Sequence, residues 1–93
     1  MSDPVDPKAV YAIADKFIAL ANELAASDDS GNVGMGIRYA AARYNSFEAS
    51  LMTPDLAADK DKMLAMFTDD FNKMMLENLE DYIRHLASLQ GQH

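Results

Sequence analysis

The fold of this chain is decided by residues 54–89, PDLAADKDKMLAMFTDDFNKMMLENLEDYIRHLASL. After Pro54 this stretch contains no further proline and no glycine, the two residues that most often interrupt a helix. Its large apolar residues recur mostly at three- and four-residue steps, which is the period of one helix face. They are Leu56, Met63, Phe67, Phe71, Met74, Met75, Leu79, Tyr82, Leu86 and Leu89. The stretch therefore predicts one long helical segment.

The start of this segment is predicted from the residues around Pro54. Thr53 has a side chain suited to an N-cap, and proline is favoured at the first helical position, where its missing N–H costs nothing. We therefore expect Thr53 as the cap and Pro54 as the first helical residue.

A first, shorter helix is predicted near the N-terminus. Asp6 can act as its N-cap and Pro7 as its first residue, and apolar residues with helical spacing follow as far as Leu24. The polar run SDDSGN, residues 27–32, has the composition of a turn and ends this helix.

A second helix is predicted from about Val33 to Met52. Its apolar residues form a narrow seam, and three alanines at 40–42 lie beside it, where they would let a neighbouring helix approach closely. Gly34 and Gly36 weaken the helix start and leave its first residue open.

The third segment is too long for its partners. A helix of this length spans about 54 Å, against about 30 Å for a twenty-residue helix. We expect a break or bend near Thr68–Asp70, combined with self-association of the remainder. The predicted fold is all-α: a small antiparallel three-helix bundle with a long or bent third helix, or four helical segments. One helical domain is expected over residues 1–93, with residues 1–6 disordered and residues 90–93 frayed.

The composition supports helices and excludes several functions. Of the 49% hydrophobic residues many are alanine or methionine, which are good helix formers. There is no cysteine, so disulfides and thiolate sites are excluded, and a reducing cytoplasm is the expected location. A net charge of −7 and a pI of about 4.5 argue against binding to nucleic acid or to anionic membranes. The sequence shows neither a secretory signal nor a membrane span.

Three pieces of the sequence resemble a small proteobacterial family known as domain of unknown function 3144. They are FIALANE at 17–23, YAAARYNSF at 39–47 and MLENLEDYI at 75–83, and the resemblance covers about Val10 to Ile83. It implies a bacterial, all-helical protein of about this length. The family brings no activity, cofactor or catalytic residue to this chain.

No motif predicts chemistry. The glycine-rich run at 31–36 lacks a preceding strand, a Walker lysine and a basic neighbour, so it is interpreted as an interhelix loop. No Glu-x-x-His motif occurs, and Asp81 and His85 are interpreted as a surface pair. His85 is the one credible imidazole, with Ser88 close to the chain end. We therefore predict no catalytic residue, no metal ligand and no cofactor, and hence no enzyme.

Two sets of residues are candidates for binding. The polar residues Arg38, Tyr39, Arg43, Tyr44 and Asn45 could line a polar groove for an acidic ligand or a partner's carboxylate, although hydrogen bonds that specify packing are the favoured role for Arg43 and Asn45. The interaction surface is predicted at Met66, Met74, Met75, Leu79 and Tyr82, because methionine suits adaptable binding surfaces.

The predicted function is that of a non-enzymatic protein-interaction module. It would self-associate, as a homodimer, or bind a protein partner through the third helix, with no role for nucleic acid or membrane. The alternative is a helical bundle that binds a small ligand or a metal ion.

Overall fold

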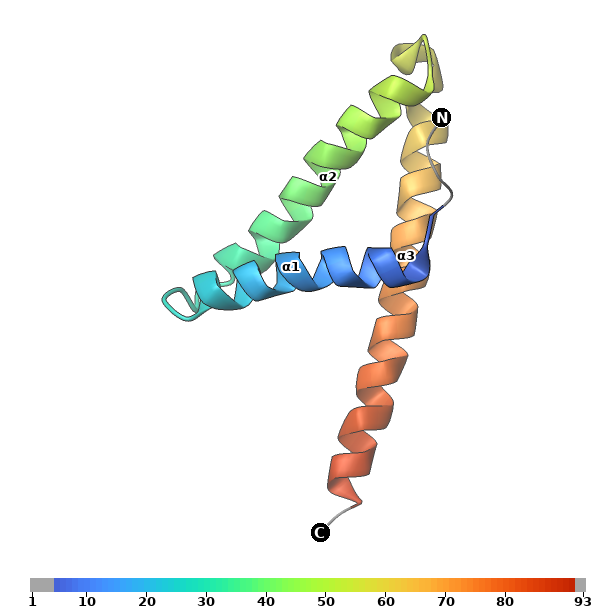
Figure 1. Cartoon of the computed structure of the whole chain (residues 1–93). Coiled ribbons are helices and arrows are strands. Elements are labelled where there is room, and N and C mark those ends of the chain that lie inside the picture. The colour runs from blue at the N-terminus through green and yellow to red at the C-terminus, as the bar shows by residue number, and fades with distance from the viewer. Residues whose placement is uncertain (1–4, 92–93) are drawn as a thin grey trace. The chain divides into compact units, whose positions relative to one another are not determined.

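The protein is all-α, with three helices of which the third is long (Figure 1). The computed structural model describes residues 5–91, and this part of the chain is 86% helical and contains no strand. The helices are α1 (Pro7–Ala25), α2 (Asn32–Met52) and α3 (Leu56–Gln90). The predicted fold class is confirmed, whereas antiparallel packing of all three helices stays a prediction. The disorder expected at 1–4 and the fraying expected at 92–93 lie outside the described residues.

The chain divides within α2 into two units, residues 1–44 and 45–93. In the first unit, α1 begins as its sequence predicts. The Asp6 side chain accepts a hydrogen bond from the Lys8 backbone N–H at 3.1 Å, and Pro7 is the first helical residue. Ala14 and Ala21, two turns apart on one face of α1, are half-buried.

The loop between α1 and α2 is organised by Asp28. Its carboxylate accepts hydrogen bonds from the backbone N–H of Ser30 at 2.9 Å and from the Ser30 hydroxyl, and its second oxygen accepts one from the Asn32 amide at 3.4 Å. These bonds, the one from the Ser30 hydroxyl first, lower the pKa of the Asp28 carboxyl below its ordinary value. Gly31 completes the turn with a φ of 94°, a conformation that other residues rarely adopt.

The two glycines near the start of α2 do not delay the beginning of the helix. The helix begins at Asn32, one residue before the predicted Val33, so Gly34 and Gly36 lie inside its first turns. The Met35 backbone N–H donates to the Gly31 carbonyl at 3.2 Å, which closes the first turn around Gly34.

In the second unit, the cap of α3 differs from the prediction. The helix begins at Leu56, and its N-cap is Asp55, whose side chain accepts from the Ala58 N–H at 3.1 Å. Pro54 therefore precedes the helix. The Thr53 hydroxyl accepts from the Asp55 N–H at 3.1 Å and donates to the Asp59 carboxylate at 2.6 Å. Thr53 and Asp55 are both capable of capping, and the aspartate takes the role because Thr53 is engaged in the turn before it.

The break expected near Thr68–Asp70 does not occur. The 35 residues of α3 form one uninterrupted helix about 52 Å long. Thr68, Asp69 and Asp70 are weaker helix formers than alanine, but each costs only a few tenths of a kcal/mol, and no proline or glycine adds to this. The prediction of a break was therefore wrong.

Of the residues that the structure describes, only Ala49 and Met63 have buried side chains, at 4% and 7% exposure. In the second unit, the half-buried Asn45 and Glu48 lie on the same face of α2 as Ala49. The half-buried Asp59 and Phe67 lie on the same face of α3 as Met63, and Thr53 between the helices is half-buried as well. We infer that the last turns of α2 pack against the first three turns of α3, and that this is where the second unit is held together.

Candidate interaction surface

The candidate site is the part of α3 that follows Phe67. We call residues 56–67 the proximal segment of α3 and residues 68–90 the distal segment. Every residue of the distal segment is exposed. Nine of these residues are large and apolar, with exposed fractions between 43% and 65%. They are Phe71, Met74, Met75, Leu76, Leu79, Tyr82, Ile83, Leu86 and Leu89.

These nine side chains spread over about 200° of arc around the helix, and most of them are concentrated in its central part. At 3.6 residues per turn, five of them fall within about 60° of arc, and we call this group the apolar stripe. Its members are Phe71, Met75, Tyr82, Leu86 and Leu89. Leu79, Ile83 and Leu76 extend it in that order along one flank, which we call the uncharged edge. The other flank, which we call the polar flank, is formed by Asn78, His85, Met74 and Asp81.

The charged residues avoid the stripe. Asp69, Asp70, Glu77, Glu80 and Asp81 lie about 110–150° of arc from the centre of the stripe, so their carboxylates face water. The distal segment is therefore an amphipathic helix, and the side chains on its apolar side are exposed.

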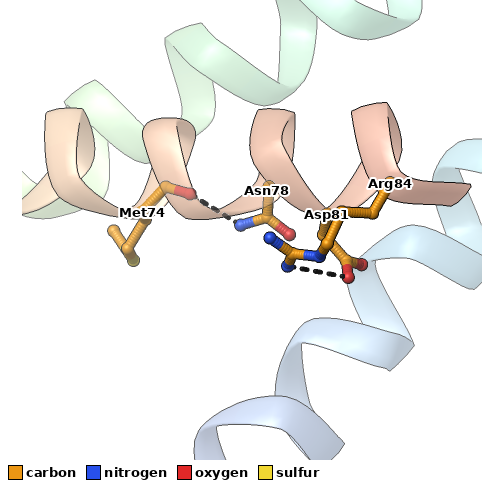
Figure 2. A network of polar contacts seen from close by, with 4 residues as sticks. All are labelled: Met74, Asn78, Asp81 and Arg84. Atoms are coloured by element: carbon orange, nitrogen blue, oxygen red, sulfur yellow. Dashed lines mark hydrogen bonds and ion pairs between the residues drawn. The ribbon is translucent and has the colours of Figure 1, made fainter. Parts of the chain in front are cut away.

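The polar contacts of the distal segment are local (Figure 2). The Asn78 amide donates to the Met74 backbone carbonyl at 2.7 Å, and Arg84 lies 3.5 Å from the Asp81 carboxylate. Both partners of this ion pair are largely exposed, and such pairs contribute at most about 1 kcal/mol. These contacts connect neighbouring turns of one helix, and the Asn78 side-chain oxygen accepts no hydrogen bond from the described residues of this helix.

Four of the five predicted surface residues lie on this apolar side: Met74, Met75, Leu79 and Tyr82. Met66 is 37% exposed but lies on the opposite side of α3, as its sequence position indicates. Leu76 and Ile83, which are 56% and 64% exposed, were not among the predicted surface residues. Their seven-residue spacing, beside Leu79, is the signal that could have identified a wider apolar face.

The predicted polar groove maps to α2. Tyr39 and Tyr44 are 69% and 62% exposed, and Arg38 donates to the Met35 sulfur at 3.6 Å. The Asn45 amide donates to the Glu48 carboxylate at 2.7 Å, one turn along the same helix. At helical spacing, Arg38, Tyr39, Arg43, Tyr44 and Asn45 are distributed around α2 and do not share one face. Binding at these residues stays a prediction.

A shallow hollow lies beside the last turns of α3, at Asp81, Tyr82, Arg84 and His85. All four side chains come from consecutive turns of one helix, so the hollow has no opposing wall. Ligand sites normally enclose most of the surface of their ligand. Among residues 5–91 no group of three or more histidine, aspartate or glutamate side chains is placed to hold a metal ion.

None of the helices within the described part of the chain is both long and apolar enough to cross a membrane.

Comparison with known proteins gives one finding. The family model described as "Protein of unknown function (DUF3144)" matches residues 10–83, the range over which the three sequence pieces indicated a resemblance. Neither the curated proteins nor the solved structures provide a match to this chain.

Proposed function

This chain belongs to a family of unknown function, DUF3144, and on that premise we propose that it is a non-enzymatic protein-interaction module. It binds a protein, either a second copy in a homodimer or a different chain, through the apolar side of the distal segment of α3. Neither nucleic acid nor membrane is part of this proposal, and the proposed location is the cytoplasm.

The single observation that carries the proposal is the exposure of nine large apolar side chains on one helix segment. Side chains of this size can lose about 150–200 Å² each, so nine half-exposed ones present on the order of 800 Å². Patches on monomeric proteins rarely exceed roughly 300–600 Å², and larger ones typically mark sites of protein interaction.

The chemistry of the surface also favours a protein as the bound molecule. The apolar stripe is long, continuous and flanked by polar side chains, which is the form that a helical or helix-binding partner covers at i, i+3, i+4 and i+7 positions. Methionine at positions 74 and 75 can adapt its shape to a partner. Binding of a small ligand or a metal ion, the rival proposal, has only the one-sided hollow at Asp81–His85 in its favour.

The proposal is tested by two variants that add the same charge to opposite sides of α3. Leu79→Glu places a carboxylate beside the apolar stripe, whereas Ser88→Glu places it on the opposite side of the helix, about two and a half turns further on. We expect Leu79→Glu to abolish association with itself or with a co-purified partner, measured by light scattering and by pull-down. Ser88→Glu should retain it.

Circular dichroism of both variants checks that the helices form. Equal retention of association by the two variants would show that binding does not use this surface. Metal- or ligand-dependent stabilisation of the wild-type chain, without any protein association, would favour the rival.

A further inference from the structure

We propose that the distal segment of α3 is covered by the same segment of a second copy of this chain, running antiparallel and related by a two-fold axis. This inference rests on the proposed function and adds to it the identity of the partner and the direction of its helix.

The exposed area is sufficient for such a pair. A stable interface of standard size removes about 800 Å² from each partner, which is close to what the nine apolar side chains present. Because a two-fold interface uses one patch twice, the stripe must match itself. Its outer members, Phe71 and Leu89, are equally far from residue 80, and Met75 and Leu86 lie at nearly equal distances inside them. Reversing the helix therefore superposes the stripe approximately on itself.

The two flanks of the stripe select the antiparallel direction. In an antiparallel pair the uncharged edge of one chain faces the uncharged edge of the second chain, and the polar flank faces the polar flank. In a parallel pair the uncharged edge of each chain faces the polar flank of the other. The antiparallel arrangement brings Leu76, Leu79 and Ile83 of the two copies together and extends the apolar contact. A parallel pair would instead place Asn78 and His85 of one copy against Leu79 and Ile83 of the other and remove their polar groups from water.

Asn78 has a place in this arrangement. Its amide N–H donates to the Met74 carbonyl, and its oxygen remains available (Figure 2). With the two-fold axis near residue 80, Asn78 of one copy lies opposite Tyr82 of the second copy. The tyrosine hydroxyl can then donate to the Asn78 oxygen, and a polar contact of this kind within an apolar seam fixes the register.

The first part of the test is the oligomeric state of the intact chain. Sedimentation equilibrium or light scattering should give a dimer. Leu86→Glu should raise the dissociation constant of this dimer at least 100-fold. Ser88→Glu, two residues further on and on the opposite side of the helix, should change it less than threefold. A wild-type chain that stays monomeric at millimolar concentration would overturn the second copy as the partner, while the binding of another protein to this surface would still stand.

The second part measures direction. The sequence has no cysteine, so single spin labels can be placed at Ser88→Cys and at Asp81→Cys, which lie on the same side of the helix. In the antiparallel pair the distance between the two labels at position 88 should exceed that at position 81 by about 10 Å, because residue 88 is farther from the axis. Equal distances at the two positions would mean a parallel pair and would overturn the proposal, although dimerisation itself would remain.

Discussion

The proximal and distal segments of α3 belong to one uninterrupted helix and carry apolar residues at the same spacing, yet they differ in burial. The proximal segment contains the buried Met63 and the half-buried Asp59 and Phe67, whereas every residue of the distal segment is exposed. A repeat of apolar residues therefore predicts which side of a helix will be covered. It does not predict whether the covering residues belong to the same chain.

The comparison also separates two sources of helix stability. The proximal segment is held by an N-cap, by the turn at Thr53 and by burial against α2. The distal segment relies on its own backbone hydrogen bonds and on contacts between neighbouring turns, and a helix held in this way is marginal in water. Its order should therefore respond strongly to anything that interrupts the helix or covers its apolar side.

The largest effect is expected where the two segments join. Asp69→Pro removes the hydrogen bond from residue 69 to the Ala65 carbonyl and introduces a steric clash in the helix, at a cost of about 3 kcal/mol or more. We expect loss of helical circular dichroism from the distal segment and loss of self-association, with the proximal segment retained. Asp69→Ala is the control and should raise helicity slightly. A proline variant with unchanged helicity and association would show that the two segments are not coupled through the helix.

A smaller effect should distinguish buried from exposed methionine. Met63→Ala leaves a cavity in the packed part of the second unit and should lower the free energy of unfolding by about 2–3 kcal/mol. Met75→Ala, with 43% of its side chain exposed, should cost less than about 1 kcal/mol in the free chain. Urea denaturation of both variants at low protein concentration, in the Leu86→Glu background, gives the difference. Equal losses would contradict the distinction between the two segments.

The smallest effect is expected in the first unit, where it leaves α3 unchanged. The pKa of Asp28 is lowered from 3.8 because the carboxylate accepts hydrogen bonds, the one from the Ser30 hydroxyl first. The ionised form thus stabilises the fold above the unfolded-state pKa, and this contribution is lost as the pH falls through the lower folded-state pKa. Asp28→Asn should reduce the loss of thermal stability as the pH falls below about 4, measured by thermal denaturation at several pH values. The distal segment should keep its response to Leu86→Glu in this variant.

Much of the fold could be predicted from local sequence. Asp6 and Pro7 were predicted to start α1, and the structure places them there. At α3 Thr53 was predicted as the cap, but Asp55 takes this role. The difference depends on the contact from Thr53 to Asp59, which is made only when the turn has folded. The expected break at Thr68–Asp70 gave too much weight to residues whose propensities are only slightly unfavourable.

The candidate site was predicted in part. Periodicity located Met74, Met75, Leu79 and Tyr82, because helical spacing alone determines which side chains share a side. Leu76 and Ile83 were missed because a single narrow stripe was assumed. Which surface stays uncovered depends on contacts between distant residues, and a single sequence does not contain this information in its local pattern.

The exposure of the distal segment has a consequence for the lifetime of the protein. A helical segment whose residues are all exposed opens at low free-energy cost, and an opened backbone can enter the active site of a protease. Cleavage before the last turns would remove Leu86 and Leu89 and with them one end of the apolar stripe. Free chains would then be degraded faster than chains in a complex, so that the amount of this protein would follow the amount that is bound.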